Sequence, residues 1–344
     1  MSSNQNHSAN NATPTETATS GAMRIDPALT SALAQASIAA YNDFEKKPFS
    51  PPPNYKFFAR FTGWDAWIGE FGQEERFGLI FMYCGPQQIA NRFIVAFRGT
   101  DSYSDMFEDA FWESATFQPY RNSVSPTPDD VCSGFNGIYA TKGGSMSASM
   151  QQQIFSLLPA QPSEVLITGH SLGGALSQLF TLDMRVSFPN VGIKTINFAS
   201  PQVGGQDWQG ACNNASATSK ITRVINWYDY VPDFPQAIFD IFDNYVSIGA
   251  EFQTAFYGKD WFPFDELHRH SILNLQIVLS HCLWLNPQIW VGTFWDAVEP
   301  TYQMWSIAPP DVPKDAMIAK LRELHALEIS TRAAKSRSSP FTQS

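Results

Sequence analysis

The residues best suited to covalent chemistry lie in the stretch 165–174, which reads Val-Leu-Ile-Thr-Gly-His-Ser-Leu-Gly-Gly. Ser171 stands between Gly169 and Gly173 in a G-x-S-x-G pattern, after a β-branched run and before a segment with mostly helical spacing of apolar residues. In a strand, sharp turn and helix, this pattern presents a serine as a nucleophile, and side chains at the two glycines would collide with neighbouring backbone. A chance match in a glycine-containing loop is the alternative, and the flanking segments argue against it. We therefore predict that Ser171 is a nucleophile and that the Leu172 N–H helps to bind the oxyanion.

A serine hydroxyl needs a base within hydrogen-bond reach, and that base is almost always a histidine. Four of the six histidines are poorly placed to act as this base. His7 lies in the N-terminal segment and His170 directly beside the serine. His281 lies inside an apolar helical run, and His325 lies near the C-terminus. The other two, His268 and His270, directly precede the apolar helical run 272–285. We favour His270 because it leads into that helix through Ser271, and His268 stays the alternative.

The carboxylate that orients the histidine is expected after a strand that lies between serine and histidine in the chain. Asp229 meets this condition because it follows the predicted strand 221–227. Asp233 is the nearest competitor, and Asp183 lies inside the helix after the nucleophile. A single aspartate in a loop is often only a turn former or a cap, so position alone leaves the choice open.

A second oxyanion donor is predicted at Thr100, which follows the strand 93–97 and can offer both its N–H and its hydroxyl. The alternative role of Thr100 is to cap the segment 103–117, which has an acidic face and an apolar face. That segment is either an ordinary surface helix or a lid over a lipid-binding site. Its candidate lid residues are Met106, Phe107 and Phe111.

Strands and helices alternate through the middle of the chain, as in a parallel sheet covered on both faces. The predicted buried strands are 77–83, 93–97, 193–198 and 221–227. A helix that begins at Asp26-Pro27 is predicted before them, the stretch 138–158 has a helical pattern, and 57–71 fits neither state clearly. Parallel sheets place their chemistry at the carboxyl ends of the strands, where Thr100, Ser171 and Asp229 all fall.

The composition is that of a globular protein and excludes several classes of partner. Of 344 residues, 44% are hydrophobic and 16% charged, and the net charge of −10 argues against nucleic acid. The chain has no phosphate-binding loop and no metal-ligand spacing, so we expect neither a cofactor nor a metal. No apolar run is long enough to cross a bilayer, and nothing in the sequence specifies an oligomeric state. The four cysteines have no motif spacing, and we favour free thiols over disulfides.

We divide the chain into three parts. Residues 1–22 read as a disordered polar leader without the basic and apolar regions of a secretory signal. This predicts either a cytoplasmic protein or export by a route other than Sec. Residues 23–310 are expected to form the folded domain, and 311–344 a mixed-charge C-terminal helix and tail.

Four motifs together resemble the class 3 (fungal-type) lipases, a family of the α/β-hydrolase superfamily. In chain order they read Phe-Arg-Gly-Thr at 97–100, Gly-His-Ser-Leu-Gly-Gly at 169–174, Phe-Ala-Ser-Pro-Gln-Val-Gly at 198–204 and Asp-Tyr-Val-Pro at 229–232. The resemblance implies a mostly parallel central sheet with helices on both faces and a nucleophile elbow at Ser171. It also implies a lipid or other ester substrate, met at an oil–water or membrane interface.

The same resemblance assigns roles to single residues. Asp229 matches the triad aspartate because it precedes x-Val-Pro, and His270 matches a His-Ser-x-x-Asn pattern. Thr100 matches the oxyanion residue. Leu275 stands where the family usually has tyrosine. Cys132, where the family often has histidine, and an aromatic insertion near 256–264 are departures that bear on the substrate and leave the chemistry intact.

The resulting prediction is a triacylglycerol lipase that works through a Ser-Asp-His triad and an acyl-enzyme. Within enzymes, a phospholipase A1 or a short-chain carboxylesterase is the alternative. From a different class, an inactive binding protein on a hydrolase scaffold is the rival, and the filled triad positions argue against it.

Overall fold

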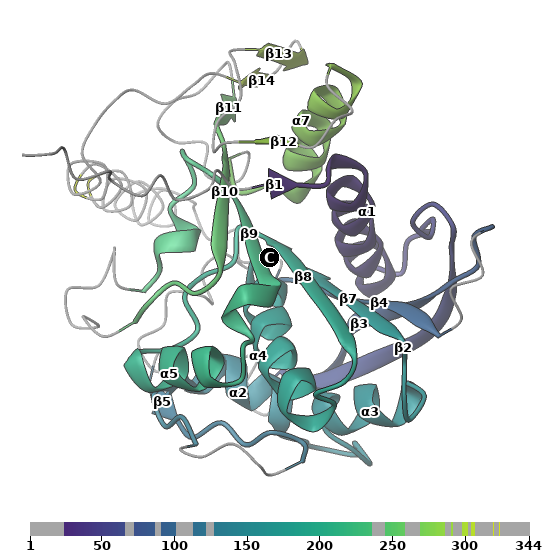
Figure 1. Cartoon of the computed structure of the whole chain (residues 1–344), viewed down its shortest axis with the longest axis vertical. Coiled ribbons are helices and arrows are strands. Elements are labelled where there is room, and N and C mark those ends of the chain that lie inside the picture. The colour runs from purple at the N-terminus through teal and green to yellow at the C-terminus, as the bar shows by residue number, and fades with distance from the viewer. Residues whose placement is uncertain are drawn as a thin grey trace, which may run out of the picture.

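A computed structural model describes residues 24–65, 72–86, 91–100, 113–121, 127–235, 245–258, 269–285, 290–291, 298–301 and 304–306, together with Ala319 and Glu323 (Figure 1). The predicted leader and most of the predicted C-terminal extension lie outside these residues. The division of the chain into three parts therefore stays a prediction.

The centre of the molecule is a seven-stranded sheet in the order β10-β9-β8-β7-β4-β3-β2. The five strands from β4 to β10 are parallel, and β3 and β2 continue the sheet antiparallel to β4. The predicted mostly parallel sheet is confirmed. Its strands are β2 (Tyr55–Asp65), β3 (Gln73–Tyr83), β4 (Arg92–Phe97), β7 (Glu164–Gly169), β8 (Gly192–Phe198), β9 (Ile221–Asn226) and β10 (Ala250–Thr254).

Helices cover both faces of the sheet, as Figure 1 shows. On one face lie α1 (Pro27–Phe44) and α7 (Ile272–Leu285), which share a buried apolar cluster with Ile94 and Ala96 of β4. The alternate β4 residues Phe93, Val95 and Phe97 point into a second cluster on the other face. That face is covered by α2 (Ser133–Ala140), α3 (Met150–Leu157), α4 (Leu172–Ser187) and α5 (Gln206–Asn214).

The first helix begins where the sequence predicts. The Asp26 side chain accepts a hydrogen bond from the Leu29 N–H at 3.1 Å, and Pro27 occupies the first helical position, where a missing N–H costs nothing. The helix α1 packs along β3, β4, β7 and β8. The position of its first residue, Pro27, therefore determines which later residues of α1 lie at the carboxyl ends of these strands.

Two sequence expectations for helices fail for identifiable reasons. The helical pattern at 138–158 is broken between α2 and α3, where Gly144 has a positive φ of 52° and the Trp64 ring lies so close to Gly143 that a Cβ atom there would be 2.2 Å from it. Ser149 then starts α3 with a capping box that includes Gln152. The predicted helix at 103–117 does not reach its expected end, since Ser114–Ala115 is strand β5, paired with β6 (Val131–Cys132).

The proposed lid residues Met106, Phe107 and Phe111 lie outside the described residues. The stretch 57–71, which the sequence left unassigned, forms β2 as far as Asp65. Small strands complete the described part: β1 (Arg24–Ile25), β11 (Phe256–Gly258), β12 (Trp290–Val291), β13 (Val298–Thr301) and β14 (Met304–Ser306).

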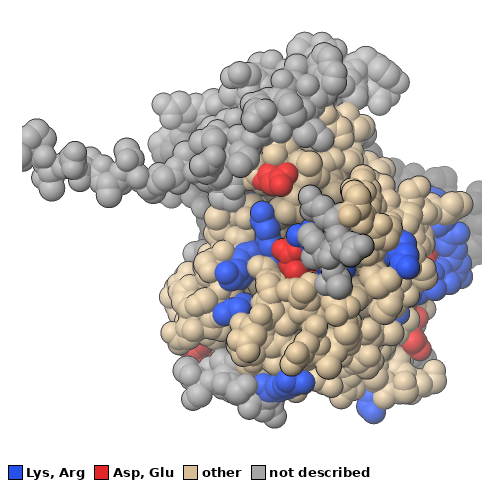
Figure 2. All heavy atoms as spheres, turned by 45° about the vertical axis from the view of Figure 1, so that its right-hand side comes forward, with Lys and Arg blue, Asp and Glu red and all other residues tan. Residues whose placement is uncertain are grey.

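Several side-chain features bear on the expected partners. Cys84, Cys132 and Cys212 are free thiols. In the described ranges no group of three or more His, Cys, Asp and Glu residues could hold a metal ion, and no helix there has the length and apolarity to span a bilayer. On the face drawn in Figure 2, basic side chains are scattered among uncharged surface and some acidic side chains.

Candidate active site

The strand–turn–helix at Ser171 has the strained backbone that the G-x-S-x-G pattern predicts. Ser171 has φ 57° and ψ −128°, a region that L residues with side chains rarely adopt. A Cβ atom at Gly169 would lie 2.1 Å from the Gly173 carbonyl oxygen, and one at Gly173 would lie 2.5 Å from the Phe97 carbonyl oxygen. Both glycines are therefore required for the close approach of β7, α4 and the end of β4.

Asp229 and His270 lie together at the same end of the sheet. Asp229 follows β9, and its Oδ2 is 2.8 Å from His270 Nδ1. Its other oxygen, Oδ1, accepts a hydrogen bond from the Val231 N–H at 2.9 Å, so both carboxylate oxygens are engaged and the side chain is buried. Since a carboxylate can only accept, His270 Nδ1 carries the proton, and Nε2 is the basic nitrogen of the ring. The alternative histidine, His268, lies outside the described residues.

The burial of His270 sets its protonation state. Burial lowers the pKa of His270 from its usual 6.5 to about 3, because a charged ring loses its hydration. The neighbouring Asp229 carboxylate acts in the opposite direction by favouring the protonated ring, and burial has the larger influence. At neutral pH the ring is therefore neutral and can accept a proton.

The two expected oxyanion donors stand on either side of the elbow. A Cβ atom at Gly99 would lie 3.0 Å from Ser171 Cβ and 2.7 Å from the His170 carbonyl oxygen, so the loop that carries Thr100 packs directly on the serine. Leu172 is the first residue of α4, where backbone N–H groups have no partner within the helix. Both segments that carry the expected donors therefore lie next to Ser171.

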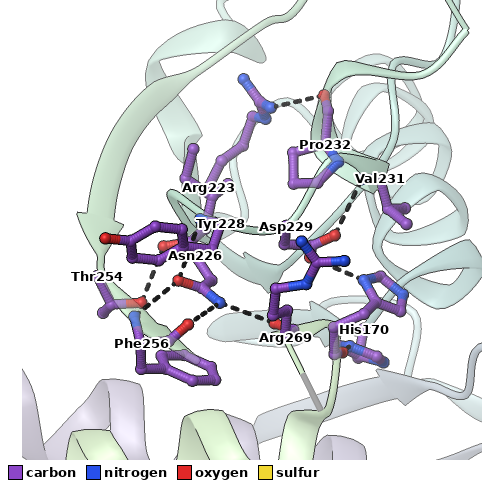
Figure 3. Close-up of polar contacts among 12 residues, drawn as sticks. His170, Arg223, Asn226, Tyr228, Asp229, Val231, Pro232, Thr254, Phe256 and Arg269 are labelled. Atoms are coloured by element: carbon purple, nitrogen blue, oxygen red, sulfur yellow. Dashed lines mark hydrogen bonds and ion pairs between the residues drawn. The ribbon is translucent and has the colours of Figure 1, made fainter. Parts of the chain in front are cut away.

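Two residues to which the sequence assigned no role at the site, His170 and Asn226, contact the segments next to the base. His170 was set aside as a base, and its ring lies between Tyr41 and the His270 carbonyl oxygen. Asn226, the last residue of β9, donates from Nδ2 to the carbonyl oxygens of Phe256 and Arg269, both at 2.9 Å (Figure 3). In the sequence, only their positions pointed to the site: His170 directly precedes the nucleophile, and Asn226 ends the strand before Asp229.

The sheet order and the strand–turn–helix at Ser171 are those of the α/β-hydrolase fold. Residues 94–239 match the model of the family Lipase (class 3). The match spans the elbow, Asp229 and Thr100, and it ends before His270.

Among curated proteins, Phospholipase A1-II 3 of Oryza sativa subsp. japonica is 33% identical over an alignment of 181 residues that covers 46% of this chain and 41% of that protein. Phospholipase A(1) DAD1, chloroplastic, of Arabidopsis thaliana is 27% identical over 158 residues, or 43% of this chain and 34% of that protein. The chain thus spans well under half the length of these relatives. Among solved structures, the Lip2 lipase of Yarrowia lipolytica has a TM-score of 0.48 and 19% identity, over 70% of this chain and 82% of that one.

Proposed function

We propose that the chain is a serine carboxylic-ester hydrolase that acts on lipid esters. The observation that carries the proposal is the hydrogen bond between His270 Nδ1 and Asp229 Oδ2, 2.8 Å long, beside the strained elbow of Ser171. A serine at a positive φ costs free energy, and such strained residues cluster at active sites. A buried, neutral imidazole that a carboxylate orients is a second feature typical of active sites, so an inactive scaffold would explain neither feature.

The proposed reaction uses these groups in sequence. Asp229 holds His270 so that its Nε2 takes the hydroxyl proton of Ser171 while the Ser171 oxygen attacks the ester carbonyl carbon. Thr100 and the Leu172 N–H stabilise the tetrahedral oxyanion, at roughly 2.7–4 kcal/mol for each donor. The alcohol leaves with the proton from His270 and the acyl group stays on Ser171. Water, deprotonated by His270 Nε2, then releases the acid and restores the serine.

The substrate is proposed as an acyl ester of a lipid, with triacylglycerol as the first candidate because of the lipase motifs. The ester bond of a glycerophospholipid is a second candidate, since the curated relatives above are named as phospholipases A1. A lid formed by Met106, Phe107 and Phe111 stays part of the proposal. Activity that rises when an ester passes its solubility limit would support that lid.

A fluorophosphonate probe tests the proposed function directly. The folded wild-type protein should be labelled at Ser171, and Ser171→Ala should abolish labelling while Ser156→Ala, on the exposed side of α3, should not. A folded wild type that stays unlabelled would overturn the enzyme proposal. Fatty acid released from triacylglycerol and from phosphatidylcholine, measured side by side, then separates the two substrate candidates.

A further inference from the structure

The main chain of the candidate base is held on both sides by side chains from other strand ends. Asn226 Nδ2, at the end of β9, donates to the Arg269 carbonyl oxygen at 2.9 Å. His170 Nε2, in the elbow after β7, lies 2.6 Å from the carbonyl oxygen of His270 itself. Two consecutive carbonyl groups, those of residues 269 and 270, are therefore held by side chains at strand ends, and Figure 3 shows the contact of Asn226 with Arg269.

The hydrogen positions on the His170 ring follow from its partners. A carbonyl oxygen can only accept a hydrogen bond, so His170 Nε2 carries the proton. His170 Nδ1 then has a lone pair, and the Tyr41 hydroxyl, 2.9 Å away, donates to it. Burial, together with the nearby His270 ring, lowers the pKa of His170 well below its usual value and so keeps this ring neutral. The hydroxyl of Tyr41 thereby selects the tautomer that can hold the His270 carbonyl.

We infer that His170 and Tyr41 are positioning residues for the proposed base His270, through a chain of hydrogen bonds from the Tyr41 hydroxyl to the His170 ring and on to the His270 carbonyl oxygen. The inference rests on the proposed function. His170 directly precedes Ser171, so one side-chain-to-main-chain bond joins the residue beside the nucleophile to the base, 100 positions further along the chain. The two imidazole rings also lie 4.6 Å apart between centroids, at 41°.

Tyr41 adds a second connection to the site. A Cβ atom at Gly99 would lie 2.1 Å from the Tyr41 hydroxyl oxygen and 2.7 Å from the His170 carbonyl oxygen. The Tyr41 hydroxyl that orients His170 therefore also packs against Gly99, in the loop that carries Thr100. The Tyr41 hydroxyl, near the end of α1, therefore contacts both the elbow and the loop that carries Thr100, and it reaches the base segment through His170.

A merely structural role for His170 would consist of filling space between α1 and α7. The two roles differ in what a substitution of similar size does. Glutamine can place its amide nitrogen near the position of His170 Nε2 and still donate to the His270 carbonyl oxygen, whereas leucine fills a comparable volume without a donor. If packing alone matters, His170→Gln and His170→Leu should behave alike.

The experiment compares His170→Leu, His170→Gln and Tyr41→Phe with the wild type in hydrolysis of a short, water-soluble ester. His170→Leu should lower kcat by about tenfold to a hundredfold at nearly unchanged KM, because the base moves relative to the serine while substrate contacts remain. His170→Gln should recover most of that loss. Tyr41→Phe should lower kcat by a smaller factor, since it removes only the group that selects the tautomer.

The control for Tyr41→Phe is Tyr139→Phe, which removes the hydroxyl of a fully buried tyrosine that donates to Asp183 at 2.9 Å, away from the triad. It should lower stability and leave kcat per folded molecule as it is. If His170→Leu keeps the wild-type kcat, or if His170→Gln loses as much as His170→Leu in folded protein, the inference is overturned.

A second measurement separates this inference from the proposed function. The downfield proton NMR signal of His270 Nδ1–H reports the bond to Asp229 without any turnover. It should be retained in His170→Gln and lost to exchange in His170→Leu. A wild type that neither reacts with fluorophosphonate nor hydrolyses esters overturns the proposed function, whereas an unchanged NMR signal in His170→Leu overturns the positioning role.

Discussion

Arg98 and Glu75 form a buried ion pair under the loop that carries Thr100. The Arg98 guanidinium lies between the rings of Phe44 and Phe77, 3.8 and 4.2 Å from their centroids. One of its nitrogens, Nη1, donates to the Gly99 carbonyl oxygen at 2.8 Å. The pair therefore fixes the residue directly before the candidate oxyanion donor, and its charges are almost wholly shielded from water.

Replacement of Glu75 by glutamine should destabilise the fold strongly. It leaves the Arg98 charge buried without its counterion, which typically costs about 3–5 kcal/mol. Glu164→Gln is the matched control, because Glu164 pairs with Arg92 at a half-exposed position, where about 0–1 kcal/mol is expected. Urea denaturation measures the free energy of unfolding of both variants. Equal losses in the two would show that the buried Arg98 pair contributes no more to stability than the partly exposed Arg92 pair.

The substitution Asp229→Asn should keep the fold and remove most of the activity. The single amide oxygen of asparagine can accept from the Val231 N–H, and its NH₂ group then faces His270 Nδ1, so the ring loses the tautomer that leaves Nε2 basic. The same exchange in a serine protease triad lowers kcat by about 10⁴, and a loss of that order is expected here. Asp233→Asn, at the nearest competing carboxylate, should leave kcat near the wild-type value. The reverse pattern would assign the acid to Asp233.

The sequence predicts the sheet and the elbow because local rules govern them. Strand and helix periods, the glycines at 169 and 173 and the Asp26-Pro27 start each depend on residues close together in the chain. In the structure the elbow follows β7, Asp229 follows β9, and the Asp229 carboxylate lies 2.8 Å from His270 Nδ1. Their catalytic roles stay proposals that the experiments above test.

The sequence could not predict what depends on distant contacts. At the break between α2 and α3, Trp64 packs against Gly143, nearly 80 positions away, and no local pattern carries that information. His170 was rejected as a base because of its place beside the serine. Its partners, Tyr41 and the His270 carbonyl oxygen, come from segments 129 and 100 positions away. Only the fold brings these three groups together.

Stability should fall as the pH drops below 6.5, and His170 should account for part of the loss. Burial lowers the pKa values of both His170 and His270 in the folded protein. The unfolded chain therefore takes up protons first, near pH 6.5, and each histidine then costs about 1.4 kcal/mol per further pH unit. Above pH 6.5 this contribution to stability is fully present.

Urea denaturation at pH 7, 6 and 5 measures that loss, and His170→Gln removes one of the two titrating rings. The wild type should lose stability more steeply than His170→Gln by about 1.4 kcal/mol per pH unit. If the free energies of unfolding of the wild type and His170→Gln fell equally with pH, the fold would not keep His170 neutral. Activity per folded molecule should persist below pH 6.5, because the base form of His270 is lost only as the pH falls toward about 3.

Asp183 gives the opposite pH dependence from the middle of α4. Its carboxylate is buried and accepts four hydrogen bonds. Oδ1 accepts from the Tyr120 N–H at 2.7 Å and the Ser187 hydroxyl at 3.0 Å, and Oδ2 accepts from the Tyr139 hydroxyl at 2.9 Å and the Gln151 amide at 2.6 Å. Burial raises the pKa of Asp183 to about 6, while the donors around it act in the other direction.

Asp183→Asn should therefore be destabilising although it removes a buried charge. An amide has one accepting oxygen, so two of the four donors would meet an NH₂ group, at a cost of about 1–3 kcal/mol for each group left unsatisfied. Asp26→Asn is the control, because asparagine caps a helix as well as aspartate does and the stability should stay near that of the wild type.

The gap between wild type and Asp183→Asn should widen as the pH falls from 6 to 4. A folded-state pKa above the unfolded value of about 3.9 means that the folded protein binds this proton more tightly, so Asp183 adds about 1.4 kcal/mol of stability per pH unit over that range. The variant lacks this gain, whereas the histidine losses are common to both proteins and cancel in the difference. Denaturation of the two proteins at pH 7, 6, 5 and 4 measures the gap. A gap that narrows toward pH 4 would mean that the four donors outweigh burial and that Asp183 is ionised throughout.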